Sequence, residues 1–265
     1  MRRREDAADP RGGGHLPALT QLHRLEPRHG AHYACCAAWG ACYATGFDLA
    51  VVVAVLANLV AIVSGNPLAA LTRGDLADAV REVGRDRVAA LAFVEMLVAQ
   101  TLAIAVSWRV ALGVGLILLL HLVLHLEPVR LARRGCAGPV ALVTATVLLP
   151  SVTAYSAAGG QADPAVWLVF SGAAALATGR TLSWPDHDRP AARPTTVLTC
   201  TAVSTATQVT AGGLLMIGAG LWLRSGWFWA AAGVAACSAL LLAPGLRRFD
   251  RVLTTVVLAM IGSLA

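Results

Sequence analysis

Long apolar segments recur along the chain after about residue 30, and they constrain the fold more than any other feature. The sequence has 265 residues, of which 57% are apolar and only 14% are charged. In a typical soluble domain, about a quarter of the residues are charged. An apolar segment of about 20 residues crosses a bilayer as an α-helix, and several in succession indicate a multi-pass membrane protein. We therefore predict an all-α bundle of transmembrane helices.

Hydropathy predicts about nine spans. They cover residues 31–46, 48–71, 88–107, 110–126, 138–158, 164–181, 196–222, 226–244 and 250–265. The first is short and only moderately apolar. Residues 1–30 are polar and rich in Gly and Pro, without the apolar stretch of a cleavable signal, so they are predicted to form a basic, partly disordered tail. Within this tail, Leu16–Arg28 is predicted to form a short surface helix, and residues 31–265 form the membrane domain.

The positions of the arginines test this span count independently. All 21 basic residues are arginine, and nineteen of them fall in the tail or in every second turn when the N-terminus is placed in the cytoplasm. Only Arg109 and Arg224 fall on the other side. Positive residues are enriched on the cytoplasmic side of membrane proteins. We therefore predict a multi-pass protein of the cell membrane with a cytoplasmic N-terminus.

The residue types also exclude some chemistry. The chain has no lysine, so it cannot form a lysine Schiff base. Its six cysteines include no Cys-x-x-Cys pair, which argues against zinc and for buried packing thiols. We expect membrane lipids as surroundings, and neither a nucleic-acid partner nor an obligate protein partner.

Two cytoplasmic turns are acidic. In the turn after the second span, Asp75, Asp78 and Glu82 are spaced i, i+3, i+7, which places them on one face if the segment is helical. The turn after the sixth span contains Asp186 and Asp188 between prolines. Hard oxygen ligands of this kind suit Mg²⁺, although each turn alone is also compatible with a solvated surface loop.

A third turn on the same side, after the fourth span, is basic. It contains Arg130 and Arg133, whose planar guanidinium groups suit phosphate, although positive residues are expected there for topology alone.

Taken together, the three turns resemble the UbiA-type membrane prenyltransferase superfamily, whose members have nine transmembrane helices. Residues 74–82 resemble its first Asp-rich motif, Asn-Asp-x-x-Asp-x-x-x-Asp, with Gly74 in place of asparagine and Glu82 in place of the last aspartate. Residues 127–130 resemble the end of the family's helix-four turn, and residues 185–195 resemble its second Asp-rich motif.

The resemblance implies transfer of an isoprenoid group from an isoprenoid diphosphate donor to a lipophilic or aromatic acceptor, with Mg²⁺ as cofactor. The implied residues fall into two sets. The metal ligands are Asp75, Asp78, Glu82, Asp186 and Asp188, with Asp78 and Asp188 counted as catalytic, and the diphosphate contacts are Arg130, Arg133 and Arg193. Loss of diphosphate would leave an allylic cation that an apolar chamber shields from water.

Within the spans, Glu95 is the one acidic residue deep in an apolar segment. A carboxylate there costs about 2–3 kcal/mol or more, so it should face the bundle interior. We count it as a catalytic candidate that orients an acceptor or stabilises a cation, with pairing to a neighbour as the equal alternative. His121 and His125 lie one turn apart and are expected to be ordinary hydrogen-bonded histidines rather than half of a metal site.

Two other functions stay open. Some members of the superfamily cyclise the isoprenoid instead of transferring it, so a membrane terpene cyclase is an enzymatic alternative. A small transporter or degenerate membrane scaffold is the non-enzymatic alternative, although the chain shows few polar or broken spans and no internal repeat.

Overall fold

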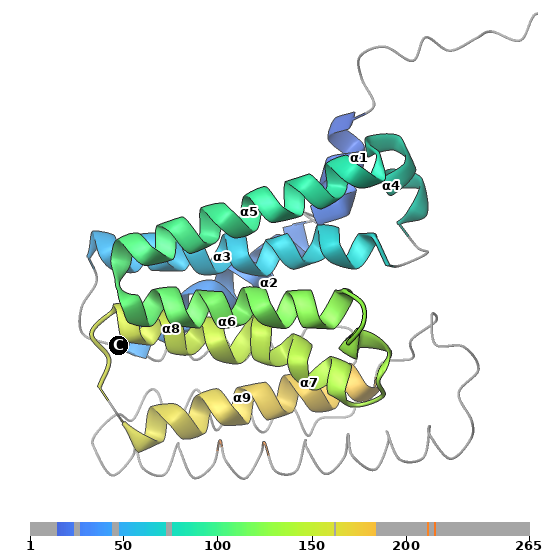
Figure 1. Ribbon diagram of the computed structural model, residues 1–265. Coiled ribbons are helices and arrows are strands. Elements are labelled where there is room, and N and C mark those ends of the chain that lie inside the picture. The colour runs from blue at the N-terminus through green and yellow to red at the C-terminus, as the bar shows by residue number, and fades with distance from the viewer. Residues whose placement is uncertain are drawn as a thin grey trace, which may run out of the picture.

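The computed structural model describes residues 15–23, 27–43, 48–72, 76–161 and 163–183, together with Ala211 and Leu215. The described segments are helices joined by turns (Figure 1). Their order is α1 (His15–His23), α2 (Pro27–Ala38), the 3-10 helix η1 (Trp39–Tyr43), α3 (Leu49–Ala70), α4 (Ala77–Val83), α5 (Arg85–Val106), α6 (Trp108–His125), the 3-10 helix η2 (Leu131–Arg133), α7 (Ala137–Val143), the π-helical turn η3 (Thr144–Leu148), α8 (Leu149–Ala157) and α9 (Pro164–Ser183).

Four described segments are long and apolar enough to cross a membrane: Leu49–Ala70, Arg85–Val106, Trp108–His125 and Ala137–Ala157. They correspond to the second to fifth predicted spans. The shorter apolar helix Pro164–Gly179 lies in the sixth. The prediction of an all-α fold with membrane-spanning helices is therefore confirmed for the described residues. The count of nine is not, because the last three predicted spans lie outside them apart from Ala211 and Leu215.

Short polar residues set the beginnings of the spanning helices. Asp48 caps α3, since its Oδ1 accepts a hydrogen bond from the backbone amide of Val51 at 3.0 Å. Ser107 caps α6 in the same way, accepting from the amide of Val110 at 3.3 Å. Such caps satisfy amides that have no partner within the helix. Because Ser107 is the only residue between α5 and α6, these two helices form a tight antiparallel pair.

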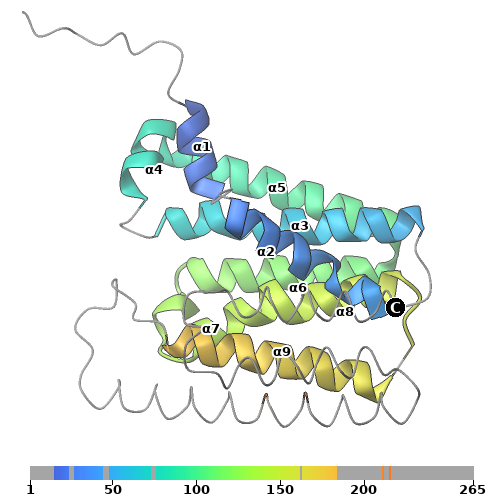
Figure 2. The ribbon, with the colours of Figure 1, turned by 180° about the vertical axis from the view of Figure 1, so that it is seen from behind.

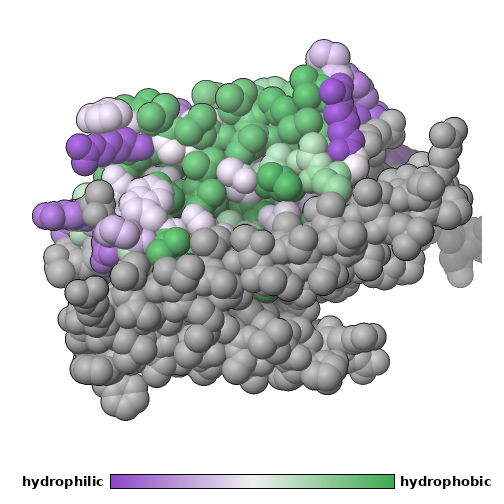
Figure 3. All heavy atoms as spheres, turned by 90° about the horizontal axis from the view of Figure 1, so that it is seen from below, coloured by the Kyte–Doolittle hydropathy of each residue, from purple (hydrophilic) through white to green (hydrophobic). Residues whose placement is uncertain are grey.

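The outer surface of α5 and α6 is apolar. Phe93, Val94, Leu97 and Ile104 on α5 are exposed, Leu97 by 68%, and Leu112, Leu116 and Leu119 on α6 are exposed as well. Among the coloured atoms of Figure 3, apolar residues gather in the middle and hydrophilic residues lie towards both ends. So many exposed apolar side chains on two adjacent helices would be unfavourable in water. Lipid chains would cover such a surface in a membrane, which agrees with the four helices that are long and apolar enough to cross one.

The interior contains an aromatic cluster that joins η1, α8 and α9. Phe170 of α9 is fully buried, and its ring centroid lies 5.2 Å from that of Trp39, 5.7 Å from Tyr43 and 5.8 Å from Tyr155. The indole N–H of Trp39 donates to the hydroxyl of Tyr43 at 2.9 Å, so the polar end of the indole is satisfied.

The first predicted span differs from the structure. Residues 31–46 were expected to form one membrane helix, but α2 ends at Ala38 and the chain continues as η1. The twelve residues of α2 rise ~18 Å, and the five residues of η1 add ~10 Å at the steeper rise of a 3-10 helix. The predicted single helix is therefore formed by two successive helices of different type, and Trp39, Gly40 and Tyr43 are buried inside the bundle.

The predicted surface helix over Leu16–Arg28 also differs. It is realised as α1, which ends at His23, and Ala18, Leu22 and His23 are all buried. Ala18 and Leu22 pack against Ala79 and Val83 of α4 and Val88 of α5. The segment is therefore docked on the bundle, and α2 crosses the boundary predicted at residue 30.

A single asparagine ties three helices together. Asn58 of α3 is fully buried, and its Nδ2 donates to the carbonyl of Ala37 at 3.2 Å and to that of Pro150 at 3.0 Å. The acceptors belong to α2 and α8. An interhelical hydrogen bond in a membrane is worth about 0.6 to 1.7 kcal/mol, so this residue stabilises the bundle.

Candidate functional site at the arginine-rich end of the bundle

Two of the three predicted site turns lie at the same end of the bundle. One is the turn between α3 and α5, which contains α4, and the other is the turn between α6 and α7. Both lie at the same end of the bundle in Figure 1, and the reverse view in Figure 2 agrees. The turn between α5 and α6 is at the opposite end, and it is followed by Arg109. The sidedness expected from the arginines is thus present in the described helices.

Arg130 connects these two turns directly. Its Nη2 donates to the backbone carbonyl of Thr72 at 3.2 Å, and its Nη1 donates to Oε1 of Glu127 at 3.0 Å. Thr72 directly precedes residues 73–75, so the first acidic turn begins beside the guanidinium of Arg130. Both Nη atoms of the guanidinium therefore already donate hydrogen bonds within the protein.

The described part of the first acidic turn is helical from Ala77 to Val83. Asp78 and Glu82 lie one turn apart on the exposed face of α4. Asp78 forms an exposed ion pair with Arg81, with 3.4 Å between Oδ1 and Nη1. Gly84, with φ of +95°, then reverses the chain into α5 in a single residue, a backbone conformation that favours glycine.

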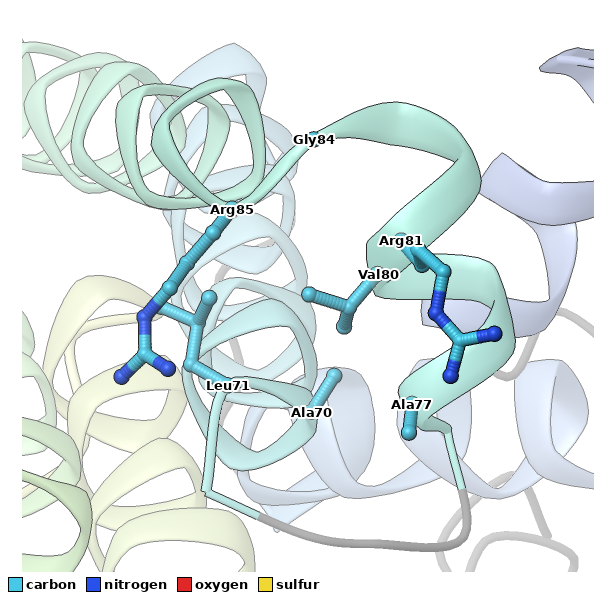
Figure 4. Close-up of a pocket in the computed structure, with 7 residues that line it drawn as sticks. All are labelled: Ala70, Leu71, Ala77, Val80, Arg81, Gly84 and Arg85. Atoms are coloured by element: carbon cyan, nitrogen blue, oxygen red, sulfur yellow. The ribbon is translucent and has the colours of Figure 1, made fainter.

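A hollow of about 460 Å³ lies beside this turn. Its wall is formed by the end of α3, by α4 and by the start of α5; it comprises Ala70, Leu71, Ala77, Val80, Arg81, Gly84 and Arg85. Figure 4 shows the apolar side chains of Val80 and Ala70 between the side chains of Arg81 and Arg85. The hollow therefore combines an apolar floor with two cationic groups, which suits an amphiphile with an anionic head.

Arg81 and Arg85 were not among the residues expected to contact diphosphate. Their spacing of four residues, with Gly84 between them, places both arginines in the turn that carries the first acidic motif. They were not counted as diphosphate contacts, because arginines on this side are expected whatever the function.

The other predicted site residues are described only in part. Asp75, Asp186, Asp188 and Arg193 lie outside the described residues. Arg133 lies in η2, next to the turn that holds Arg130, and its side chain is outside the description. The structure therefore brings together Asp78, Glu82 and Arg130 at one end of the bundle, and it leaves the second acidic motif untested.

The carboxylates described here do not form a Mg²⁺ site by themselves. Across residues 76–161 and the other described segments, no group of three or more His, Cys, Asp or Glu side chains gathers. Asp78 and Glu82 supply two carboxylates on one helical face. A site of the predicted kind would need oxygen ligands from Asp75, Asp186 or Asp188 as well.

Glu95 is paired with a residue of the N-terminal segment. Its Oε1 lies 2.6 Å from Nε2 of His23, while its Oε2 is buried without a hydrogen-bond partner among the described residues. This geometry corresponds to the pairing alternative considered for Glu95. The partner is 72 positions away in the chain, which is why no local pattern indicated it.

His121 is enclosed in the bundle next to Gly65. Its ring stacks on that of His125 with 6.5 Å between centroids, and neither of its nitrogens has a hydrogen-bond partner among the described residues. A Cβ at position 65 would overlap the His121 ring, so glycine leaves room for the ring there. The expectation of an ordinary hydrogen-bonded histidine is thus not met in the described part of the chain.

Comparison with known proteins identifies no relative: no family model, no curated protein and no solved structure matches this chain.

Removing the Arg130 side chain is expected to lower the free energy of unfolding by about 1 kcal/mol. The bond to Thr72 crosses between two turns, and a net hydrogen bond is worth about that much. Thermal unfolding in detergent micelles, followed by circular dichroism, should show a decrease of about 2 °C for Arg130→Ala. Arg134→Ala is the matched control, because the described bond of Arg134, to the carbonyl of Pro128 at 3.4 Å, stays within its own turn. Equal decreases for the two variants would contradict a stabilising bond between the two turns.

Proposed function

We propose that the chain is an integral membrane prenyltransferase that moves an isoprenoid group from an isoprenoid diphosphate to a lipophilic or aromatic acceptor. The proposal places it in the cell membrane, with the arginine-rich end of the bundle facing the cytoplasm. What supports it most is one observation: the turn with Asp78 and the turn with Arg130 share one end of the bundle and are tied by the bond from Arg130 to Thr72.

The hollow beside α4 gives this chemistry a place to begin. Arg81 and Arg85 offer positive charge where a diphosphate would lie, and the apolar wall of Ala70, Leu71 and Val80 suits the first carbons of an isoprenoid chain. An isoprenoid donor is lipid-like, so it reaches such a hollow from the bilayer. Fixed positive charge beside the leaving group stabilises the negative charge that develops as the carbon–oxygen bond breaks.

Apolar helices would protect the reacting carbon. An allylic cation is captured by water unless its surroundings are dry. The interior faces of α3, α5 and α6 are lined by small and branched apolar residues, including Ala61, Ala99 and Val114. In this proposal, Asp75, Asp78, Glu82, Asp186 and Asp188 would hold Mg²⁺, whose chemistry is neutralisation of the diphosphate charge.

The test uses the full-length protein in lipid nanodiscs with Mg²⁺, geranylgeranyl diphosphate and a panel of lipophilic phenols and quinols. Diphosphate release and prenylated product are measured together by mass spectrometry and a coupled assay. We expect Asp188→Asn to reduce turnover roughly 100-fold, the loss typical when one group that stabilises transition-state charge is removed. Asp78→Asn is expected to act in the same direction.

Asp86→Asn is the matched control, because Asp86 is an exposed carboxylate in the first turn of α5, at the same end but outside both acidic motifs. Full turnover in Asp78→Asn and Asp188→Asn would contradict the site. A cyclic hydrocarbon or alcohol formed without any acceptor would establish the terpene cyclase alternative. No diphosphate release from farnesyl or geranylgeranyl diphosphate, with folded protein, would favour a transporter or scaffold.

A further inference from the structure

The contact between His23 and Glu95 is unusual because both ring nitrogens of the histidine face acceptors. Nδ1 lies 2.9 Å from the backbone carbonyl oxygen of Leu19, and Nε2 lies 2.6 Å from Oε1 of Glu95. A carbonyl oxygen can only accept, so Nδ1 must carry a hydrogen to make the first bond. Whether Nε2 also carries a hydrogen then depends on the protonation of the Glu95 carboxyl group.

Making both bonds at once requires one more proton, because a neutral His23 with its hydrogen on Nε2 would keep the bond to Glu95 and lose the bond to Leu19. If Nε2 were unprotonated and Glu95 were ionised, a lone pair would face a carboxylate at 2.6 Å, which is repulsive. With one proton between them, Nε2–H donates to the carboxylate, or the carboxylic acid donates to Nε2. Either form makes a short, strong hydrogen bond. The geometry therefore describes a pair that holds one proton.

We propose that His23 and Glu95 form a proton-binding site that holds α1 against α5, so that α1 stays docked while the pair carries its proton and is released when the proton leaves. The proton moves between the pair and bulk water, and no other reactant is needed. This site does not depend on the proposed prenyl transfer.

Burial and a neighbouring hydrogen bond support the contact between His23 and Glu95. His23 is 9% exposed, and Oε2 of Glu95 is buried with no hydrogen-bond partner among the described residues. Nδ2 of Asn66 on α3 donates to the backbone carbonyl of His23 at 3.0 Å, which fixes the end of α1. An unpaired carboxylate inside an apolar helix is costly, so the proton that pairs it stabilises docking.

Release of α1 would have a defined structural result. Ala18 and Leu22 cover Ala79 and Val83 on the buried face of α4, whose other face carries Asp78 and Glu82. The proton on the His23–Glu95 pair thus controls whether α4 is covered on one side.

The direction of the pH dependence follows from His23. The hydrogen bond to Glu95 raises the pKa of His23 above its ordinary value of 6.5, against the opposing effect of burial. A group whose pKa is higher in the docked state stabilises that state at low pH and stops doing so as the pH rises through the docked-state pKa. Docking of α1 is therefore expected to weaken on the alkaline side of pH 6.5.

Other titratable groups on the elements around α1 are few among the described side chains. From α2, Tyr33 donates to Oδ1 of Asn66 at 3.4 Å, and α3 contributes Asn66, which carries no charge. The remaining charged groups on α4 and the first turn of α5 are exposed: Asp78, Arg81, Glu82, Arg85, Asp86 and Arg87. None of these groups is among the described contacts of His23.

The experiment measures hydrogen–deuterium exchange of the full-length protein in nanodiscs at pH 6 and pH 9, corrected for the intrinsic change of exchange rate. In the wild type, protection of peptides within residues 15–23 is expected to fall at least tenfold at pH 9. Peptides within Leu49–Ala70 serve as the internal control and should keep their protection at both values.

Glu95→Gln supplies the decisive variant. The amide N–H of glutamine donates to Nε2 of a neutral His23, so the contact no longer needs a proton, and α1 should stay protected at both pH values. Glu95→Ala removes the contact, and α1 should be unprotected at both. Protection of α1 that is equal at pH 6 and pH 9 in the wild type would overturn the proposal, as would a Glu95→Gln protein with the wild-type pH dependence.

A second measurement covers the case in which Glu95→Gln does not fold. Nitrogen-15 spectra of histidine-labelled wild-type protein report the ring nitrogens of His23 directly. A titration midpoint above 6.5 supports the proton site, and a midpoint at or below 6.5 overturns it.

Discussion

Replacing Phe170 by alanine is expected to lower the free energy of unfolding by about 3–5 kcal/mol, the range observed when a buried phenylalanine is truncated. Phe170 is 0% exposed and touches the rings of Trp39, Tyr43 and Tyr155. Removing it leaves a cavity among three aromatic rings on η1 and α8. Lipid chains cannot fill that cavity, since it lies inside the bundle. Thermal unfolding in micelles should show a decrease of about 10 °C.

Phe93→Ala is the control for this effect. Phe93 has the same side chain, but it is 49% exposed on the outer surface of α5. Lipid or detergent chains replace its contacts after truncation, so the change should stay within about 0.5 kcal/mol. If Phe93→Ala destabilised the protein as much as Phe170→Ala, the assignment of an inner and an outer face would be wrong.

Gly40→Ala is expected to be the second large effect. A Cβ at position 40 would overlap the backbone oxygen of Ser151 and lie 2.6 Å from its carbonyl carbon. Backbone atoms cannot rotate away as a side chain does, so η1 would have to separate from α8. Overpacking of this kind costs about 1–3 kcal/mol or more. The change also disturbs the aromatic cluster, because Trp39 and Tyr43 flank Gly40 on η1.

Gly30→Ala is the matched control. Gly30 is in α2, and no atom lies within 4 Å of the position its Cβ would take. Alanine favours a helix over glycine by about 1 kcal/mol, so this variant should be as stable as the wild type or more stable. Unfolding followed by circular dichroism at 222 nm separates the two glycines. Equal stability of the Gly40→Ala protein and the wild type would disprove the close approach of η1 to α8.

Hydropathy predicted the spanning helices well, and the reason is physical. A segment that must hydrogen-bond all its backbone groups away from water becomes a helix wherever it is apolar for long enough. The predicted boundaries of α3, α5, α6 and α9 differ from the structure by no more than three residues. The spacing in the first acidic turn places its carboxylates on one face if the segment is helical, and Asp78 and Glu82 do lie on one face of α4.

Hydropathy alone does not distinguish a helix that packs inside the bundle from one that faces lipid. Trp39 and Tyr43 of η1 pack with residues of α3, α8 and α9, and an apolar packing surface has the same composition as a lipid-facing one. The same limit explains α1. Ala18 and Leu22 were assigned to a surface helix because nothing nearby in the chain indicates α4 as their partner.

The sequence by itself determined the all-helical membrane architecture, the sidedness of the arginines and the position of the first acidic turn, because each depends on local composition along one helix. Only the tertiary structure decided which of these polar groups meet. Arg130 reaches Thr72 across 58 positions, and Glu95 meets His23 across 72. Contacts of that kind depend on how helices pack, and a pattern of spacing along the chain carries no information about a partner on another helix.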